Sequence, residues 1–347
     1  YEILLVNNFW RKKVIKKQKV VSKQLFGISR IVDLISDNSK KGKYNKVVAS
    51  NINNKLLKDE FDIYEFKLKR EINSDNINLF LKMDPCSGNE PCKNQIKELL
   101  SNEFSTKFRI LSAECGSKLK DTPCKIKYGE CGKYNMDIAV KQISKKDKSG
   151  DSYIYKQLSD GTDLLALSDG MGVGRKAARE SQSALRLLEK LIKAGFSRKL
   201  AIETINSALF LRNQEEKFTT LDIVFFDTFS GDVIFNKIGS MSSYIKREWE
   251  VEEIKTSSLP AGILENIEVY EESAQLQAGD FVVMFSDGVI DAINHVNDKE
   301  QWFLKTLQNS SFDKSKDLAE YILDVIKENG KIEDDLTIIV FKNYEIT

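Results

Sequence analysis

The sequence of 347 residues has one histidine, four prolines and no long hydrophobic run. A single imidazole excludes metal sites that need two or three histidines, so a bound metal would have to use oxygen ligands. We expect this residue, His295, to lie at the surface or to support a neighbouring group, because a lone histidine in a loop is more often that than a catalyst. No stretch approaches the roughly 18 apolar residues that a membrane-spanning helix requires.

Charge and cysteine content exclude two further classes of protein. With 53 Lys and Arg against 52 Asp and Glu, the net charge of +1 provides no chain-wide basic field that would attract nucleic acid. The number of cysteines is odd and no two form a C-x-x-C pair, which argues against a disulfide framework and against structural zinc. We expect reduced thiols at all five positions, which are Cys86, Cys92, Cys115, Cys124 and Cys131.

The first 40 residues are strongly basic, with cationic side chains such as Arg11 and Lys12 set among apolar residues that recur at steps of three, four and seven. This pattern predicts an amphipathic helix over residues 1–40, in the form of a coiled-coil stem. A basic start is also expected just cytoplasmic of a membrane span, which places the anchor upstream of residue 1. A solvated, charged helix face explains this stretch equally well.

Residues 41–132 predict a small α+β domain with a regulatory or connective role. Strand-like stretches at Phe61–Leu68 and Phe108–Ser112 flank a helix-like stretch at Asn94–Phe104, and a turn-forming Asp-Pro-Cys-Ser-Gly segment lies at 84–88. No chemistry is evident in this part of the chain. A second domain is predicted over residues 133–347, beginning with the alternating apolar residues of a first strand.

The second domain has the pattern strand, strand, two helices, several strands, two helices and a last strand. Apolar residues recur at helical spacing over Arg175–Ala194 and Arg198–Arg212. The strands Leu221–Thr228 and Val233–Ile238 are joined by Phe-Ser-Gly-Asp, which predicts a hairpin. Runs of antiparallel strands interrupted by helix pairs favour an α+β sandwich of two sheets with helices on its outer faces.

Four aspartates lie beside apolar runs of this second domain. Asp169 and Asp287 each follow a short buried run and precede glycine, and we expect each to lie in a tight turn at the edge of a sheet. Asp151 precedes a strand-like run, and Asp334 precedes the last one. One Ser-Asp-Gly is usually a plain turn, but four such positions in one domain favour a metal site.

Carboxylate oxygens suit Mg²⁺ or Mn²⁺, and a few of them suffice to hold two such ions. A pair of ions requires one bridging ligand, and Asp169 is the natural bridge because the glycine after it, Gly170, allows a backbone carbonyl to face the site. In this hypothesis Asp287 and Asp334 hold one ion and Asp151 holds the other. Asp169 and Asp287 are also the candidate catalytic residues.

These motifs resemble the ordered motifs of the PPM metal-dependent serine/threonine phosphatases, over roughly residues 133–347. Within that family, the GDSY and SDGMG-x-G forms and the stretch 213–222 are most similar to the sporulation phosphatases of the stage II sporulation protein E type. The basic stem and the cysteine-bearing region also resemble that group. The segments that carry the resemblance are Ser149-Gly150-Asp151, Ser168-Asp169-Gly170-Met171-Gly172, Ser286-Asp287-Gly288 and Asp334-Asp335-Leu336-Thr337.

The resemblance implies a PPM-type α-β-β-α sandwich and a membrane-tethered phosphatase with two divalent cations, Mn²⁺ or Mg²⁺, of which it favours Mn²⁺. The implied substrate is a phosphoserine anti-anti-sigma factor, whose dephosphorylation activates a sporulation sigma factor. The resemblance further implies that the helices at 175–212 form a switch and a homodimer contact, and that the first 130 residues contact the cell-division machinery. Asp335 would orient its loop, whereas Val173 replaces an asparagine that is common in relatives.

Two rival interpretations come from other functional classes. The Asp169-Gly-Met-Gly-Val-Gly segment is similar to the nucleotide loop of an ATP-binding histidine-kinase-like domain, but that fold needs an Asn-bearing helix upstream, where this sequence predicts strands. A catalytically inactive phosphatase-like binding module is the second rival. It would be favoured by loss of a ligand aspartate, and none is lost.

Overall fold

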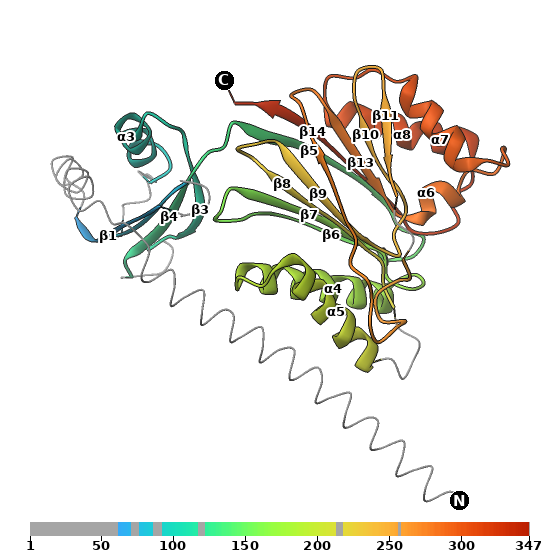
Figure 1. The fold of residues 1–347 in the computed structure, drawn as a ribbon, viewed down its shortest axis with the longest axis horizontal. Coiled ribbons are helices and arrows are strands. Elements are labelled where there is room, and N and C mark those ends of the chain that lie inside the picture. The colour runs from blue at the N-terminus through green and yellow to red at the C-terminus, as the bar shows by residue number, and fades with distance from the viewer. Residues whose placement is uncertain are drawn as a thin grey trace, which may run out of the picture.

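The computed structural model describes residues 62–70, 76–85, 92–116, 122–212, 218–255 and 258–346. Two five-stranded antiparallel sheets lie face to face with helices on both outer sides, and a smaller four-stranded sheet lies beside them (Figure 1). The predicted α+β sandwich is therefore confirmed. The basic helix predicted for residues 1–40 lies outside the described residues. Within the described ranges, no helix is long and apolar enough to span a membrane.

The first sheet of the sandwich has the strand order β12-β9-β8-β7-β6, so that β6 is an edge strand. The second sheet has the order β11-β10-β13-β14-β5. The strands of the first sheet are β6 (Ser152–Gln157), β7 (Thr162–Ser168), β8 (Leu221–Asp227), β9 (Asp232–Ile238) and β12 (Glu271–Gln275). Those of the second are β5 (Tyr134–Ile143), β10 (Ser243–Lys246), β11 (Val251–Ile254), β13 (Phe281–Phe285) and β14 (Leu336–Glu345).

Alternation of side chains along the strands produces three apolar layers. Inward residues of the two sheets, such as Leu167 and Met284, form the layer between them. The opposite face of the first sheet packs against α4 and α5, and the outer face of the second packs against α6, α7 and α8 (Figure 1). These helices are α4 (Arg175–Lys193), α5 (Arg198–Arg212), α6 (Asp287–Asp291), α7 (Lys299–Gln308) and α8 (Ser315–Asn329).

The smaller sheet and the helix α3 form what we call the N-terminal module, with the strand order β1-β2-β4-β3. Its own core gathers apolar residues from all five elements or their ends, including Leu79, Leu100 and Phe108. The predicted domain boundary at residues 132 and 133 falls in the short connection from β4 to β5, and it stays a prediction. The elements are β1 (Ile63–Arg70), β2 (Ile77–Met83), α3 (Gln95–Phe104), β3 (Phe108–Glu114) and β4 (Cys124–Glu130).

Most predicted elements occur within one or two residues of their expected bounds, but the turn expected at Asp287 is wrong. Ser286 precedes a short helix, α6, whose first residue is Asp287. A Cβ on Gly288 would lie 2.1 Å from the backbone oxygen of Asp335, so only glycine fits where the start of this helix passes the residue ahead of β14. Asp287 nevertheless lies at the sheet edge, directly after β13.

Candidate metal centre

Asp151 and Asp169 lie at the open end of the hairpin formed by β6 and β7. Ser152 pairs with Ser168 in this hairpin, so the residue before β6 and the residue after β7 are brought side by side. Ser181 on α4 donates a hydrogen bond to the carbonyl oxygen of Gly150 (2.6 Å), and its hydroxyl also lies 2.8 Å from that of Ser152. The helix thus holds the start of β6 against the sheet.

Asp287 and Asp334 come together in the same way in the second sheet. The paired strands β13 and β14 continue beyond their last ladder residues, because Ser286 N–H donates to Thr337 O (3.0 Å) and Thr337 N–H donates to Ser286 Oγ (2.9 Å). Asp287 follows Ser286, and Asp334 lies just ahead of β14. Asp334 is among the carboxylates that act on Asp287 electrostatically.

The two pairs of aspartates meet where the sheets face each other. The hydroxyl of Thr337, from the second sheet, donates a hydrogen bond of 2.6 Å to Asp151 Oδ2, from the first. The carboxyl group of Asp169 interacts with both Asp151 and Asp287. The structure therefore places Asp169 in contact with Asp151 and Asp287 and brings Asp334 within electrostatic reach of Asp287, so that the four aspartates converge from four separate segments of the chain.

The acidic groups of this cluster lie close together, and the pKa values of three of them are raised. Burial, together with the Asp151 and Asp287 carboxylates, raises the pKa of Asp169 to about 10. Burial also raises the pKa of Asp151. The pKa of Asp287 is raised by burial and by Asp291, although part of this side chain is exposed. The groups with the largest effect on these three pKa values are other acids and the hydroxyls of Thr337 and Ser286, and none of them is a cation.

The donor set fits a hard divalent cation. Within the described residues, no three His, Cys, Asp or Glu side chains are arranged so that they could hold a metal ion as they stand. The carboxylates instead lie against one another, and Asp151 Oδ1 is buried without a hydrogen-bond donor. A buried carboxylate oxygen without a donor is costly, and a cation between the carboxylates would satisfy it. The ligand roles of the four aspartates and of the Gly170 carbonyl stay predictions.

Position 170 requires a glycine because of close packing, whereas from the sequence we expected it for the freedom of its backbone. Its backbone does not have a positive φ. A Cβ at this position would instead lie 2.3 Å from the backbone oxygen of Ala177 in α4, which leaves no room for a side chain. Gly150 is similarly enclosed, since a Cβ there would lie 2.7 Å from Gly172 O. The loops that carry Asp151 and Asp169 are therefore packed backbone against backbone.

Asp335 connects the loops around the cluster, as expected for a residue that orients them. Its carboxylate accepts hydrogen bonds from the N–H groups of Lys145 (2.7 Å) and Gly150 (2.6 Å). Its own N–H donates to Asp334 Oδ1 (2.8 Å). One buried side chain thus ties the segment ahead of Asp151 to the segment that contains Asp334.

Several supporting residues were missed by the sequence analysis. Thr220 Oγ1 accepts a hydrogen bond from Asp169 N–H (3.0 Å), and Thr220 N–H donates to Asp169 O (2.9 Å). The Thr219 hydroxyl also donates to Asp169 O. Thr337 had a sequence signal, since it belongs to the Asp-Asp-Leu-Thr motif, whereas the two threonines before β8 lie in the stretch 213–222, which carried a resemblance but indicated no role for them. Their role depends on the pairing of β7 with β8.

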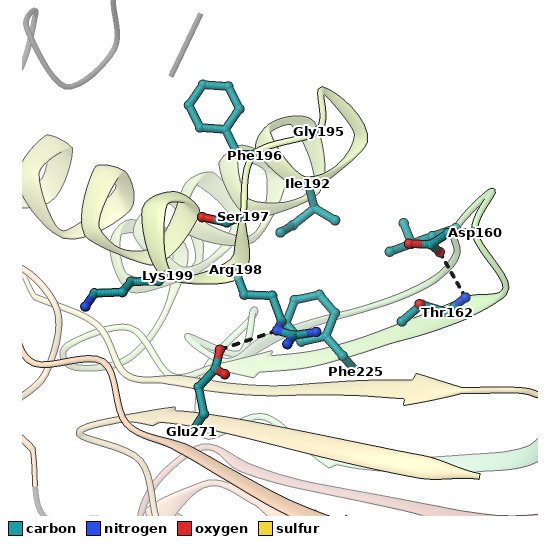
Figure 2. A pocket seen from close by; sticks show the side chains of 11 residues that line it. Asp160, Thr162, Ile192, Gly195, Phe196, Ser197, Arg198, Lys199, Phe225 and Glu271 are labelled. Atoms are coloured by element: carbon teal, nitrogen blue, oxygen red, sulfur yellow. Dashed lines mark hydrogen bonds and ion pairs between the residues drawn. The ribbon is translucent and has the colours of Figure 1, made fainter. Parts of the chain in front are cut away.

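The remaining candidates lie elsewhere. His295 is exposed, its Nδ1 lies 2.9 Å from Asn329 O, and its ring packs against Trp302. The described cysteines are free thiols, as expected, whereas Cys86 lies outside the described residues. A cavity of about 500 Å³ lies at the opposite end of the β6–β7 hairpin from the aspartates, beside the connection between α4 and α5 (Figure 2). Its lining includes Phe196, Arg198 and Glu271.

The chain is similar in sequence to proteins of one known family. The sequence profile of the stage II sporulation protein E (SpoIIE) family matches residues 159–344. The chain belongs to this SpoIIE family. The stage II sporulation protein E of Priestia megaterium is 31% identical over 341 residues, which cover 97% of this chain and 58% of that protein. The protein of the same name from Bacillus subtilis is 29% identical over 337 residues, covering 96% of this chain and 40% of that protein.

A solved structure resembles nearly the whole chain. It contains the PP2C phosphatase domain and a fragment of the regulatory domain of the cell fate determinant SpoIIE from Bacillus subtilis. It covers 97% of this chain and 98% of its own, with 29% identity and a TM-score of 0.65. The sandwich is therefore the PP2C fold of the SpoIIE family. The kinase-like alternative is wrong, because the residues ahead of Asp169 form β6 and β7.

Proposed function

We propose that this chain is a metal-dependent protein serine phosphatase. The observation that carries the proposal is the convergence of four aspartates, from four segments of a PP2C fold, into one uncompensated acidic cluster. Membership of the SpoIIE family supports the same activity. Since the chain spans 58% and 40% of the length of the two relatives, the activity of the whole protein is part of the proposal.

Two divalent cations, Mn²⁺ or Mg²⁺, would be held by Asp151, Asp169, the Gly170 carbonyl, Asp287 and Asp334. When bound, such a pair polarises a phosphoryl group and lowers the pKa of a shared water molecule. The chain itself contributes orientation: Thr337 fixes one oxygen of Asp151, and Asp335 fixes the loops on either side. Asp169 lies between the aspartates of the two sheets, so we assign it the bridging role and assign Asp287 the second catalytic role.

The proposed substrate is the phosphoserine form of an anti-anti-sigma factor, whose dephosphorylation activates a sporulation sigma factor. The carboxylates do not select this substrate, because the same ligands would serve any phosphomonoester. The substrate class is inferred from the motif resemblance and the SpoIIE family membership. From the same resemblance we infer that this chain is the cytoplasmic part of a protein anchored in the membrane upstream of residue 1. We also infer that it forms a homodimer through α4 and α5, and that its N-terminal region contacts the cell-division machinery.

The test is phosphate release from a phosphoserine anti-anti-sigma protein, with and without Mn²⁺, by the wild-type chain and by Asp287→Asn. We expect turnover that depends on the metal and is lost in the variant. Asp232→Asn is the matched control, because it removes an exposed carboxylate at the far end of β9 and should retain full activity. Equal turnover by Asp287→Asn and the wild type would exclude the proposed site.

If the wild-type chain releases no phosphate, titration with Mn²⁺ distinguishes a wrong substrate from the absence of a metal site. Binding without turnover would contradict the substrate assignment and retain the metal site. Absence of both binding and turnover would favour the phosphatase-like binding module over the enzyme. Mg²⁺ is titrated in parallel, because the aspartate oxygens are ligands that suit both ions.

A further inference from the structure

The β6–β7 hairpin has two chemically different ends. At its open end, Asp151 immediately precedes β6 and Asp169 immediately follows β7, so the hairpin carries two of the four clustered aspartates. At its closed end, the turn at residues 158–161 faces the N-terminal module (Figure 1). β6 pairs only with β7 because it is the edge of the first sheet. A strand with one neighbour opens more readily than a central strand.

The N-terminal module holds the closed end through two asparagine side chains. Asn76 Nδ2 donates a hydrogen bond to Asp160 O (2.9 Å), and Asn78 Nδ2 donates to Ser159 O (3.0 Å). Both asparagines are buried, with 4% and 5% of their surface exposed. These contacts satisfy turn carbonyls that the hairpin itself leaves without a partner at this interface.

An ion pair adds a third contact between the module and the hairpin. Arg109 of β3 lies with its Nη1 3.1 Å from Oδ1 of Asp163 in β7, and Asp163 is fully buried. The second oxygen of Asp163 accepts a hydrogen bond of 2.8 Å from the hydroxyl of Tyr155 in β6. One carboxylate therefore joins the module to both strands of the hairpin. Without the guanidinium, this carboxylate would be a buried and unpaired charge.

The helical layer meets the same turn through Leu158, which packs in the apolar cluster beneath α4 and α5. Leu158, Asp160 and Thr162 line the cavity of about 500 Å³ that separates the turn from the connection between α4 and α5 (Figure 2). At the open end, by contrast, α4 is bonded directly to the hairpin through Ser181. The closed end of the edge hairpin thus receives polar contacts from two sides: Thr228, directly after β8, donates to Gly161 O through its hydroxyl (2.7 Å) and its N–H (3.1 Å), and the N-terminal module holds the carbonyl groups of Ser159 and Asp160.

We propose that Arg109 is a positioning residue for the aspartate cluster and acts through the β6–β7 hairpin. By pairing with Asp163 it keeps the edge strand β6 closed against β7, and this keeps Asp151 beside Asp169. The inference rests on the proposed function, because it treats the cluster as the cation site. The N-terminal module would then help to position the aspartates through the hairpin, without a hydrogen bond or ion pair from its described residues to any of them.

The test compares Arg109→Met, Asp163→Asn and the double variant in the full chain. Mn²⁺ is titrated into each by calorimetry, and hydrogen exchange of residues 151–158 is measured without metal. We expect each single variant to bind Mn²⁺ about tenfold more weakly and to exchange faster in β6. The double variant should lose less than the sum of the two, because each single change leaves the other charge unpaired. Lys125→Ala is the matched control, since it breaks an exposed ion pair with Glu114 inside the module.

Different outcomes separate this inference from the proposed function. Wild-type exchange in β6 and wild-type Mn²⁺ affinity in both single variants would overturn the inference while leaving the phosphatase intact. Absence of Mn²⁺ binding by the wild type would contradict the proposed function, and faster exchange in the variants would still support the positioning role of Arg109. If Arg109→Met fails to fold, Asp163→Asn provides the same test from the hairpin side. Additive losses in the double variant would also overturn the inference.

Discussion

The sandwich contains a fully buried carboxylate in β8 and a partly buried cluster of carboxylates, and the two differ in what surrounds them. Asp222 lies fully buried in β8, with Oδ2 2.6 Å from the Nζ of Lys237 in β9. Ser243 of the facing sheet completes the contact, with its hydroxyl 2.8 Å from each of these two atoms. Asp169 directly follows β7, the strand next to β8 in the same sheet, and it is surrounded by other carboxylates instead.

The difference shows which buried charges are structural and which await a ligand. The Asp222–Lys237 pair is compensated within the chain, and Ser243 ties its charge to the second sheet, so it connects the two halves of the sandwich. Burial lowers the pKa of Lys237, and Asp222 opposes this change. The aspartate cluster has no such partner, and its repulsion is a cost that a cation would remove. Clustered acids without a cationic partner in the described part of the chain, rather than burial itself, mark the candidate site.

The largest expected effect comes from removing the charge at the centre of the cluster. Asp169→Asn should lower metal-dependent turnover by about 10³-fold and raise the stability of the metal-free chain at neutral pH, because a neutral amide removes the cost of protonating Asp169 on folding. Phosphate release and urea unfolding in a chelator measure the two effects. A variant that loses activity and stability together would show that Asp169 is structural, as Asp222 is.

The second prediction concerns the compensated pair. Lys237→Met should destabilise the chain by about 3–5 kcal/mol, because it leaves Asp222 buried and unpaired. Adding Asp222→Leu should recover most of this loss, since two well-packed apolar residues often replace a buried ion pair without cost. Urea unfolding of the two variants measures both changes. If Lys237→Met lowered the free energy of unfolding by less than about 1 kcal/mol, the buried Asp222 would not need its cationic partner, and it would no longer differ from the aspartate cluster in this respect.

The third prediction is the pH dependence of the metal-free chain. The pKa of Asp169 is raised from 3.8 to about 10 on folding, so the folded state holds a proton that the unfolded state releases. The stability from this group is complete below pH 4 and is lost as the pH rises toward 10, by up to about 1.4 kcal/mol per pH unit. Urea unfolding in a chelator from about pH 5.5 to 8.5 measures the slope. Asp169→Asn should flatten it, and a stability that rises with pH would contradict this account.

The smallest effect is expected from an ion pair of the same length at the surface. Lys255 Nζ lies 2.7 Å from Glu300 Oε2, and both side chains are about half exposed, at 57% and 45%. Lys255→Ala should cost less than about 1 kcal/mol, because water and salt screen an exposed pair. Urea unfolding beside Lys237→Met isolates the effect of burial. Comparable losses in the two variants would show that burial is not the cause.

The sequence by itself predicted the four aspartates, their order and the α+β sandwich, because each aspartate directly precedes or follows an apolar run. Strand periodicity and helix spacing are local properties, so they are readable along the chain. The same local reading placed Asp287 in a turn, where the structure has the helix α6. A helix of five residues is too short to leave a periodic signal in the sequence.

Only the tertiary structure decided which side chains meet. Thr337 reaches Asp151 across 186 positions of sequence, and Lys237 finds Ser243 on the facing sheet. Arg109 pairs with Asp163 across the predicted domain boundary. Such contacts depend on strand order and on the packing of one sheet against another, and neither is encoded in any single segment. The sequence therefore determined which residues can do chemistry, whereas the fold determined which charges are compensated.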